Sequence, residues 1–105
     1  MTYREVSPSA AFAARAGARL VDVREPDEYR GELGHIPGAQ LVPLATIPEA
    51  AAAWDRETPL VVICRSGGRS SRAAQALVAA GFRKVMNLSG GMLAYTAAGL
   101  PVARS

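Results

Sequence analysis

The chain has 105 residues, half of them hydrophobic and 20% charged, which is long enough for one folded domain and too apolar for an intrinsically disordered one. No apolar run approaches the roughly 20 residues that a membrane helix needs, and residues 1–20 lack the apolar core of a secretion signal. One cysteine and one histidine provide neither an internal disulfide nor the usual zinc site. We therefore expect a cytoplasmic protein without metal, cofactor or membrane contact.

The net charge of +3 is unevenly distributed along the chain. All nine carboxylates lie at or before Glu57, where they outnumber the arginines by three, whereas the chain from Thr58 onward has six bases and no acid. The single cysteine lies in this basic part, which favours an anionic ligand. We expect no nucleic-acid partner, because the bases are scattered and only six aromatic side chains are available for stacking.

Short β-rich runs alternate with alanine-rich segments, and glycine or proline stands at most joints, which predicts an α/β fold. Ser7 is expected to cap the first helix, with Pro8 at its first position and Gly17 beyond its end. Thr46 is expected to cap a later helix. The elements predicted for the first half are a strand at 3–6, a helix at 8–16, a strand at 19–23, a helical turn at 26–29, a turn and short strand within 34–44, and a helix through 48–54.

The second half is predicted to contain the central strand of the sheet. The apolar run at residues 60–64 follows a Thr-Pro pair and is typical of a strand buried on both faces. Apolar residues then recur at helical spacing, which predicts an amphipathic helix from near Ser70 to Gly81. The remaining predicted elements are a strand at 84–88 and a closing helix at 91–98, with Gly99 past its end. A three-layer α/β/α domain accounts for this order.

The stretch VVICRSGGRSSR, residues 61–72, places Cys64 at the end of the central strand, followed by a glycine-rich turn and a helix. Open parallel sheets bind ligands beyond the carboxyl ends of their strands. Gly67 and Gly68 allow successive N–H groups to converge on negative charge, and the following helix adds the positive end of its dipole. These features favour thiolate over thiol and predict a nucleophile at neutral pH, provided that the sulfur is accessible.

A lone cysteine after a β-run is also typical of an inert core residue. The flanking residues argue against this alternative, because Arg65, Arg69 and Arg72 would be costly to bury without partners. Arg72 has two interpretations, a position on the solvated face of the helix or contact with substrate. We therefore expect an anion site around Cys64.

Three stretches together resemble a single-domain rhodanese, a sulfurtransferase: LVDVREPDEYRGELGHIPGAQLVPL, VVICRSGGRSSRAAQALVAAGF and VMNLSGGMLAY. The resemblance implies one rhodanese-like domain over residues 1–105, with a central, mainly parallel sheet of about five strands between helices. It also implies that Cys64 takes the outer sulfur of a small anionic donor such as thiosulfate as a persulfide. An acceptor such as cyanide, a thiol or a protein cysteine then collects that sulfur.

The resemblance further implies that the active loop runs from Cys64 through Arg69. We expect Arg65 and Arg69 to attract and orient the anionic donor, and the hydroxyl groups of Ser66 and Ser70 to donate hydrogen bonds. The residues expected to contact substrate are Arg65, Ser66, Gly67, Gly68, Arg69 and Ser70.

Two other functions remain open at this point. Cysteine-dependent phosphatases and arsenate reductases have a similar strand, loop and helix, but phosphatases place five residues between cysteine and arginine, whereas four separate Cys64 from Arg69. The chain could instead be a sulfur carrier or docking module with little turnover alone. Two-domain rhodaneses carry lysine where this chain has Ser66, which leaves the preference for thiosulfate open.

Other polar residues have structural interpretations beside functional ones. His35 lies between glycine and proline and is expected to organise a turn rather than act as a base. Asp22 and Arg24 are expected either to border the site or to form a structural ion pair. The large side chains Trp54, Met92 and Tyr95 are expected to pack in the core. The Gly90-Gly91 pair is expected to set the last helix, whose N-terminus could approach the same pocket.

Overall fold

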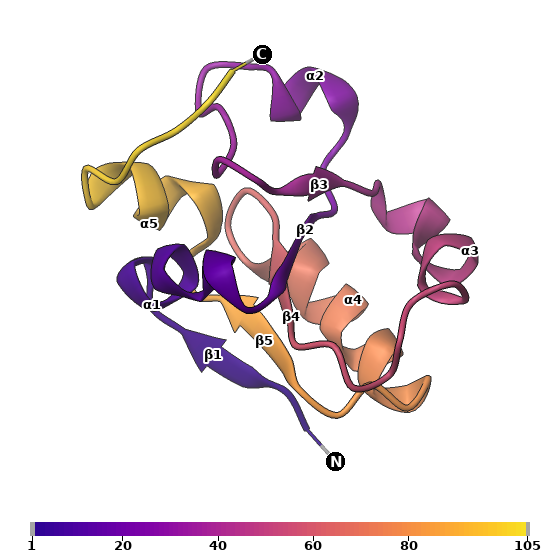
Figure 1. The fold of residues 1–105 in the computed structure, drawn as a ribbon. Helices are drawn as coiled ribbons and strands as arrows, with labels where there is room; N and C mark the ends of the chain where they lie inside the picture. The colour runs from indigo at the N-terminus through magenta and orange to yellow at the C-terminus, as the bar shows by residue number, and fades with distance from the viewer. Residues whose placement is uncertain (1, 105) are drawn as a thin grey trace.

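The computed structural model describes residues 2–104, and its centre is a five-stranded parallel sheet. The strand order is β1-β5-β4-β2-β3, so β4 lies in the middle, as the long apolar run predicted. Figure 1 shows the turn after β4 at the same edge of the sheet as α2. The strands are β1 (Arg4–Val6), β2 (Arg19–Asp22), β3 (Gln40–Leu41), β4 (Leu60–Ile63) and β5 (Val85–Leu88).

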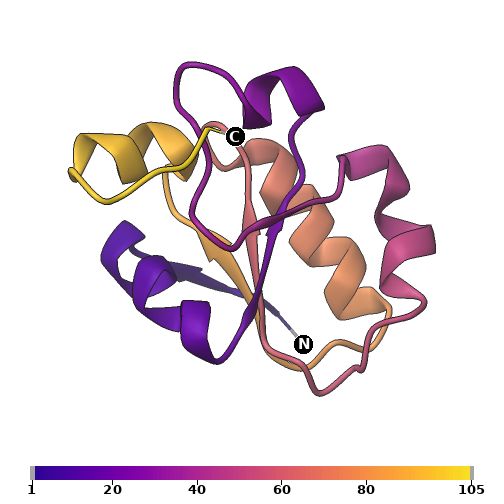
Figure 2. The ribbon, with the colours of Figure 1, turned by 45° about the horizontal axis from the view of Figure 1, so that its top comes forward.

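Helices cover both faces of the sheet, which confirms the predicted three-layer α/β/α fold. The views in Figures 1 and 2 agree that α1 (Pro8–Ala13) and α5 (Gly91–Ala97) lie on one face, and that α3 (Ile47–Ala51) and α4 (Gly68–Ala79) lie on the other. The short helix α2 (Pro26–Tyr29) lies beyond the carboxyl ends of the strands. None of the helices within residues 2–104 is long and apolar enough to cross a membrane.

The side chains of β4 alternate between two buried clusters, because successive residues of a strand point to opposite faces. All four residues of this strand are buried, as expected for a parallel sheet covered on both sides. The cluster with α1 and α5 contains Val61, Ile63, Met92 and Tyr95, and the cluster with α3 and α4 contains Leu60, Val62, Trp54 and Leu77. The predicted packing roles of the large side chains at 54, 92 and 95 are thereby confirmed.

Two predicted helix boundaries were wrong. Helix α4 begins at Gly68 rather than near Ser70, because Gly67 adopts φ +107° and turns the chain directly into the helix. Helix α3 ends at Ala51 instead of reaching Trp54, whose N–H bonds to the carbonyl of Ala51 in a tight turn. That turn directs the indole edge-on against the ring of Phe82 in the core.

The expected Thr46 cap is also absent, since its hydroxyl donates to the carbonyl of Pro43 instead of accepting from the helix. A short 3-10 helix at Leu44–Thr46 leads into α3, and another at Ala14–Ala16 extends α1. The Ser7 cap is confirmed, because its side chain accepts a hydrogen bond from the N–H of Ala10.

Asp22 and Arg24 form a buried ion pair, which is one of the two roles expected for them; Arg24 also lines a groove between α2 and α5. The Arg24 Nη2 and Nε atoms lie 2.8 and 2.9 Å from the two carboxylate oxygens of Asp22, and both side chains are at most 1% exposed. Nη2 also donates to the carbonyl of Gly34 at 2.7 Å. The pair therefore fastens the turn after α2 to the end of β2.

His35 organises the same turn, as predicted. Its ring stacks on Tyr29 with centroids 3.6 Å apart, and Nδ1 lies 2.8 Å from the Tyr29 carbonyl oxygen. Its backbone forms an isolated antiparallel bridge with Ala103. The Tyr29 hydroxyl donates to the carbonyl of Ala39, so the whole turn is held from several sides.

We predict that Asp22→Ala lowers the free energy of unfolding by about 3–5 kcal/mol, because it leaves the Arg24 charge buried without its partner. Urea denaturation would measure this loss. Glu57→Ala is the matched control, since Glu57 pairs with Arg83 where both side chains are more than 60% exposed, and it should cost at most about 1 kcal/mol. Equal losses in the two variants would contradict the prediction.

Candidate active site

Cys64 immediately follows β4, at the carboxyl end of the central strand. The turn that follows brings two hydrogen-bond donors to its sulfur: the N–H of Gly67, at an N···S distance of 3.0 Å, and the hydroxyl of Ser70, at 3.3 Å. The left-handed φ of Gly67 lets the chain curl back over the sulfur. The sequence predicted this convergence of loop donors on the thiol.

The pKa of the Cys64 thiol reflects two opposing effects. Burial raises the pKa, while hydrogen bonds from the Ser70 hydroxyl and from the backbone N–H groups of Ser70, Gly67 and Ser66 lower it. The net result is a pKa below the ordinary value for cysteine. The site therefore favours the thiolate, the nucleophilic form of the side chain, more than the surroundings of an ordinary cysteine do.

The predicted nucleophile depended on an accessible sulfur, and this condition is not met in the structure. Cys64 is 1% exposed and belongs to the core cluster under α4. In contrast, three residues of the turn that follows Cys64 are exposed: Arg65, Ser66 and Gly68. The thiol therefore lies directly beneath an exposed polar turn rather than open to solvent.

Arg69 makes a bidentate ion pair with Glu28 of α2, with N···O distances of 2.7 and 2.8 Å. The hydrogen bond from Arg69 is the largest influence on the pKa of Glu28 and lowers it to about 2 from an ordinary 4.5. The pair therefore adds to stability above about pH 4.5 and loses that contribution as the pH falls toward 2. The Arg69 guanidinium, which was expected to orient an anionic donor, is thus already bound to Glu28.

The other two arginines near the loop are exposed. Arg65 lines a groove of about 340 Å³ between α2 and α5, where Leu93, 39% exposed, also lies. Three carboxylates from the acidic half of the chain, Asp27, Glu28 and Glu32, line the same groove. The basic surplus predicted around the cysteine is thus partly offset in space. Arg72 lies exposed on α4, consistent with the solvated-face interpretation.

The first turn of α5 holds the loop from the opposite side. The N–H groups of Met92 and Leu93 donate to the carbonyl oxygens of Cys64 and Arg65 at 2.9 and 3.0 Å. This approach requires a glycine at 91, where φ is +61° and a Cβ would lie 2.4 Å from the Arg65 carbonyl oxygen. The expectation that the N-terminus of this helix approaches the pocket is confirmed.

Asn87 supports the loop from below and was missed by sequence reasoning, which treated residues 84–88 only as a strand. Its side chain is buried, and Nδ2 lies 3.4 Å from the Gly67 carbonyl oxygen and 3.1 Å from a carboxylate oxygen of Glu5. Glu28 was missed as well. The only local signal for either residue was a polar side chain inside a predicted element, which does not reveal a distant partner.

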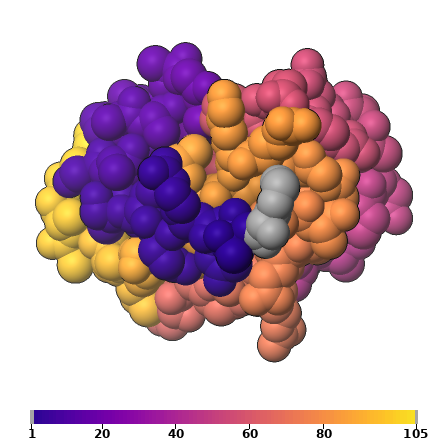
Figure 3. Space-filling view, turned by 90° about the horizontal axis from the view of Figure 1, so that it is seen from below, coloured from indigo at the N-terminus to yellow at the C-terminus, as the bar shows by residue number. Residues whose placement is uncertain are grey.

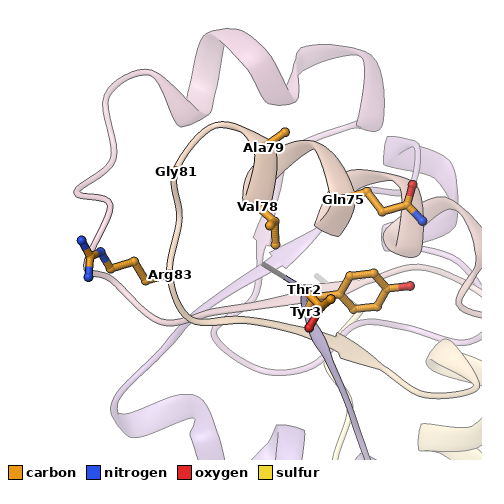
Figure 4. A pocket seen from close by; sticks show the side chains of 7 residues that line it. All are labelled: Thr2, Tyr3, Gln75, Val78, Ala79, Gly81 and Arg83. Carbon is orange, nitrogen blue, oxygen red and sulfur yellow. The ribbon is translucent and has the colours of Figure 1, made fainter.

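A larger cavity, of about 810 Å³, lies elsewhere, between α4 and the residues just before β1 (Figure 4). Figure 3 shows this end of the molecule, where the described N-terminal segment, from residue 2 onward, lies against the segment around α4 and β5. The residues that line the cavity are Thr2, Tyr3, Gln75, Val78, Ala79, Gly81 and Arg83, and none of these seven is a cysteine, histidine or carboxylate. The described residues 2–104 also contain no group of three or more potential metal-ligating side chains.

The family model for the rhodanese-like domain matches residues 9–98. The chain belongs to the rhodanese-like family. A thiosulfate sulfurtransferase GlpE from Pseudomonas fluorescens is 40% identical over 90 residues, which cover 85% of this chain and 81% of the relative. A sulfurtransferase from Allochromatium vinosum is 39% identical over 83 residues, covering 79% and 76% of the two chains.

The crystal structure of a rhodanese-related protein from Thermoplasma volcanium has a TM-score of 0.88 and 26% identity, and the match covers 98% of this chain and all of that one. The expected fold and family are confirmed. The chain is an enzyme of the rhodanese family, a sulfurtransferase.

We predict that Gly91→Ala destabilises this rhodanese by roughly 3 kcal/mol, because the new Cβ adds a clash with loop backbone to the strain of a positive φ. Gly99→Ala is the matched control: Gly99 also has a positive φ, of +75°, but no atom lies within 4 Å of the added Cβ. The control should lose only about 1–2 kcal/mol. Indistinguishable urea unfolding curves for the two variants would show that the close approach is unimportant.

We also predict that the rate of Cys64 alkylation by iodoacetamide rises with pH around a midpoint below that of an ordinary cysteine, because the thiolate is the reacting form. Ser70→Ala should move this midpoint upward, since it removes a donor to the sulfur. Ser71→Ala is the control, because Ser71 contacts the Tyr3 hydroxyl instead. An unchanged midpoint in the Ser70 variant would contradict the assigned role of its hydroxyl.

Proposed function

We propose that this rhodanese transfers sulfane sulfur by way of a persulfide on Cys64. The observation that carries the proposal is the pair of donors, from Gly67 and Ser70, placed 3.0 and 3.3 Å from a cysteine sulfur at the end of the central strand. The sulfurtransferase names of the relatives support the class of reaction. Cys64 is the one nucleophilic sulfur that the sequence offers.

The reaction consists of two displacements. In the first, the Cys64 thiolate attacks the outer sulfur of thiosulfate, the sulfur–sulfur bond of the donor breaks, and sulfite leaves with the bonding electrons. The product is a cysteine persulfide whose terminal sulfur carries the negative charge. In the second, an acceptor nucleophile attacks that terminal sulfur, and the Cys64 thiolate leaves and is regenerated.

Negative charge rests on sulfur before and after the first displacement. The Gly67 N–H and the Ser70 hydroxyl stabilise the thiolate, and the loop N–H groups of Ser66, Gly67 and Gly68 are proposed to stabilise the terminal sulfur of the persulfide. Hydrogen bonds from α5 and from Asn87 to the carbonyl oxygens of the loop limit how far these donors move during the reaction. Arg65, exposed at the groove, is proposed to attract the anionic donor.

Access to the sulfur requires a displacement of the loop. Cys64 is 1% exposed, but the turn that covers it consists of exposed residues at 65, 66 and 68. We propose that this turn shifts outward to admit the donor and that the added persulfide sulfur occupies the space so created.

The phosphatase alternative receives no support from the loop. Ser70 stands where the phosphatase arginine would fall, and its hydroxyl donates to the sulfur of Cys64. The arginine that is present, Arg69, is bound to Glu28. A phosphate ester would therefore find neither the longer loop nor a free guanidinium at that position.

The decisive test is mass spectrometry of the purified protein after treatment with thiosulfate. We expect a gain of one sulfur atom on Cys64 that dithiothreitol reverses and that Cys64→Ser lacks. Cys64→Ser should also lose thiosulfate-to-cyanide transfer by at least about a hundredfold. The absence of any adduct with thiosulfate or polysulfide would contradict the proposal.

The fate of the added sulfur separates the remaining possibilities. Rapid discharge to cyanide or a small thiol would show an enzyme that turns over by itself. A stable persulfide that is released only to a protein cysteine would show a dedicated carrier. Hydrolysis of a phosphate ester by the wild type and not by Cys64→Ser would instead favour the phosphatase alternative.

A further inference from the structure

We propose that Glu28 is a positioning residue for Cys64, which acts by holding Arg69 and thereby the end of the loop that carries the donors to the sulfur. This inference rests on the proposed function for its relevance to turnover. Its physical content is the alignment of the loop, which can be measured without any sulfur transfer.

Glu28 is presented from a rigid element despite the shortness of α2. The helix begins with a capping box, in which Oε1 of Glu28 accepts a hydrogen bond from the N–H of Glu25 at 3.0 Å. The next residue, Tyr29, stacks on His35 and donates its hydroxyl proton to the Ala39 carbonyl. The carboxylate therefore occupies a fixed place beside the loop, 41 residues away from Arg69 in sequence.

Arg69 links this carboxylate to the sulfur site through one residue. It lies in the first turn of α4, directly before Ser70, whose hydroxyl donates to the sulfur, and two residues after Gly67. A positive side chain in a first turn is unfavourable with the helix dipole, and this first turn contains no acidic residue. The carboxylate from α2 supplies the missing negative charge and, by its bidentate geometry, also fixes the direction of the guanidinium.

The alternative role for Arg69, direct binding of an anionic donor, conflicts with this geometry. Both terminal nitrogens of its guanidinium already donate to Glu28 oxygens, at 2.7 and 2.8 Å. A donor anion would have to displace a carboxylate that stays ionised throughout the neutral range. The arginine is therefore a tie between α2 and the loop.

Glu28 could influence Cys64 through its charge or by positioning the loop, and these two roles predict opposite changes in the pKa of Cys64 when Glu28 is neutralised. If Glu28 acted only through its charge, its neutralisation would lower the pKa of Cys64, because a nearby negative charge disfavours the thiolate. If Glu28 positions the loop, its loss weakens the contacts from Gly67 and Ser70, and the pKa of Cys64 rises. The direction of the change decides between them.

The experiment compares Glu28→Gln with Asp27→Asn by the pH dependence of Cys64 alkylation with iodoacetamide. Asp27 lies next to Glu28, is exposed and lines the same groove, so its variant removes the same charge without releasing Arg69. We expect the alkylation midpoint to rise in Glu28→Gln and not in Asp27→Asn. A midpoint that stays the same or falls in Glu28→Gln would overturn the proposal.

Two further variants keep the test decisive if Glu28→Gln does not fold, as judged by circular dichroism. Glu28→Asp keeps the charge but shortens the side chain, and should raise the alkylation midpoint above that of the wild type. If Glu28→Gln folds, the rise in Glu28→Asp should be the smaller of the two. The double variant Glu28→Arg with Arg69→Glu restores a pair with reversed charges and should return the midpoint toward the wild type. Failure of both variants to move the midpoint as stated would contradict a positioning role.

Kinetics provide a second measure in the thiosulfate-to-cyanide assay. We expect Glu28→Gln to lower kcat by roughly tenfold, because a misplaced loop stabilises the reacting sulfur less well, while KM for thiosulfate changes little. A lower KM with unchanged kcat would instead identify Arg69 as a donor site that Glu28 normally blocks. An alkylation shift without any persulfide would leave the positioning role standing and refute only the proposed function.

Discussion

The hydrogen bonds from the first turn of α5 to the carbonyl oxygens of Cys64 and Arg65 fix the backbone on which the site depends. They are possible only because Gly91 lacks a Cβ, which allows helix and loop backbones to touch. Because α5 binds the carbonyl oxygens at the start of the loop, the N–H groups that follow can point toward the sulfur. The same contact joins the end of the central strand to the end of β5, so the reactive residue is tied to the rigid centre of the sheet.

The chemistry of the site follows from a contest between burial and hydrogen bonding. Removing a thiolate from water is unfavourable, and Cys64 is nearly fully buried. The donors from Ser70, Gly67 and Ser66 outweigh that cost and lower the pKa. A small domain thus makes a buried thiol more acidic than an ordinary cysteine by replacing water with donors from its own backbone and from the Ser70 hydroxyl.

The sequence allowed the sheet, the central strand and the cysteine loop to be predicted, because each has a local signal: an apolar run, helical periodicity, or glycines beside a strand end. The α4 boundary was missed because the helical conformation of Gly68 depends on how Gly67 turns the chain. The pair of Glu28 and Arg69, and the contact of Asn87 with Gly67, join residues far apart in sequence, so no local pattern encodes them. The burial of Cys64 was considered from the sequence but not favoured, because it results from the packing of α4 on the sheet.

The neutralisation of Arg69 by Glu28 also bears on how fast an anionic molecule finds the site. Within the described loop from Cys64 to Arg69, Arg65 is the arginine that forms no ion pair with a carboxylate. The carboxylates that line the groove partly cancel its electrostatic field. We therefore expect Arg65 to act on a small anion at short range and long-range steering toward this opening to be weak. Encounter will depend on ordinary diffusion, and ionic strength will affect the capture rate only slightly.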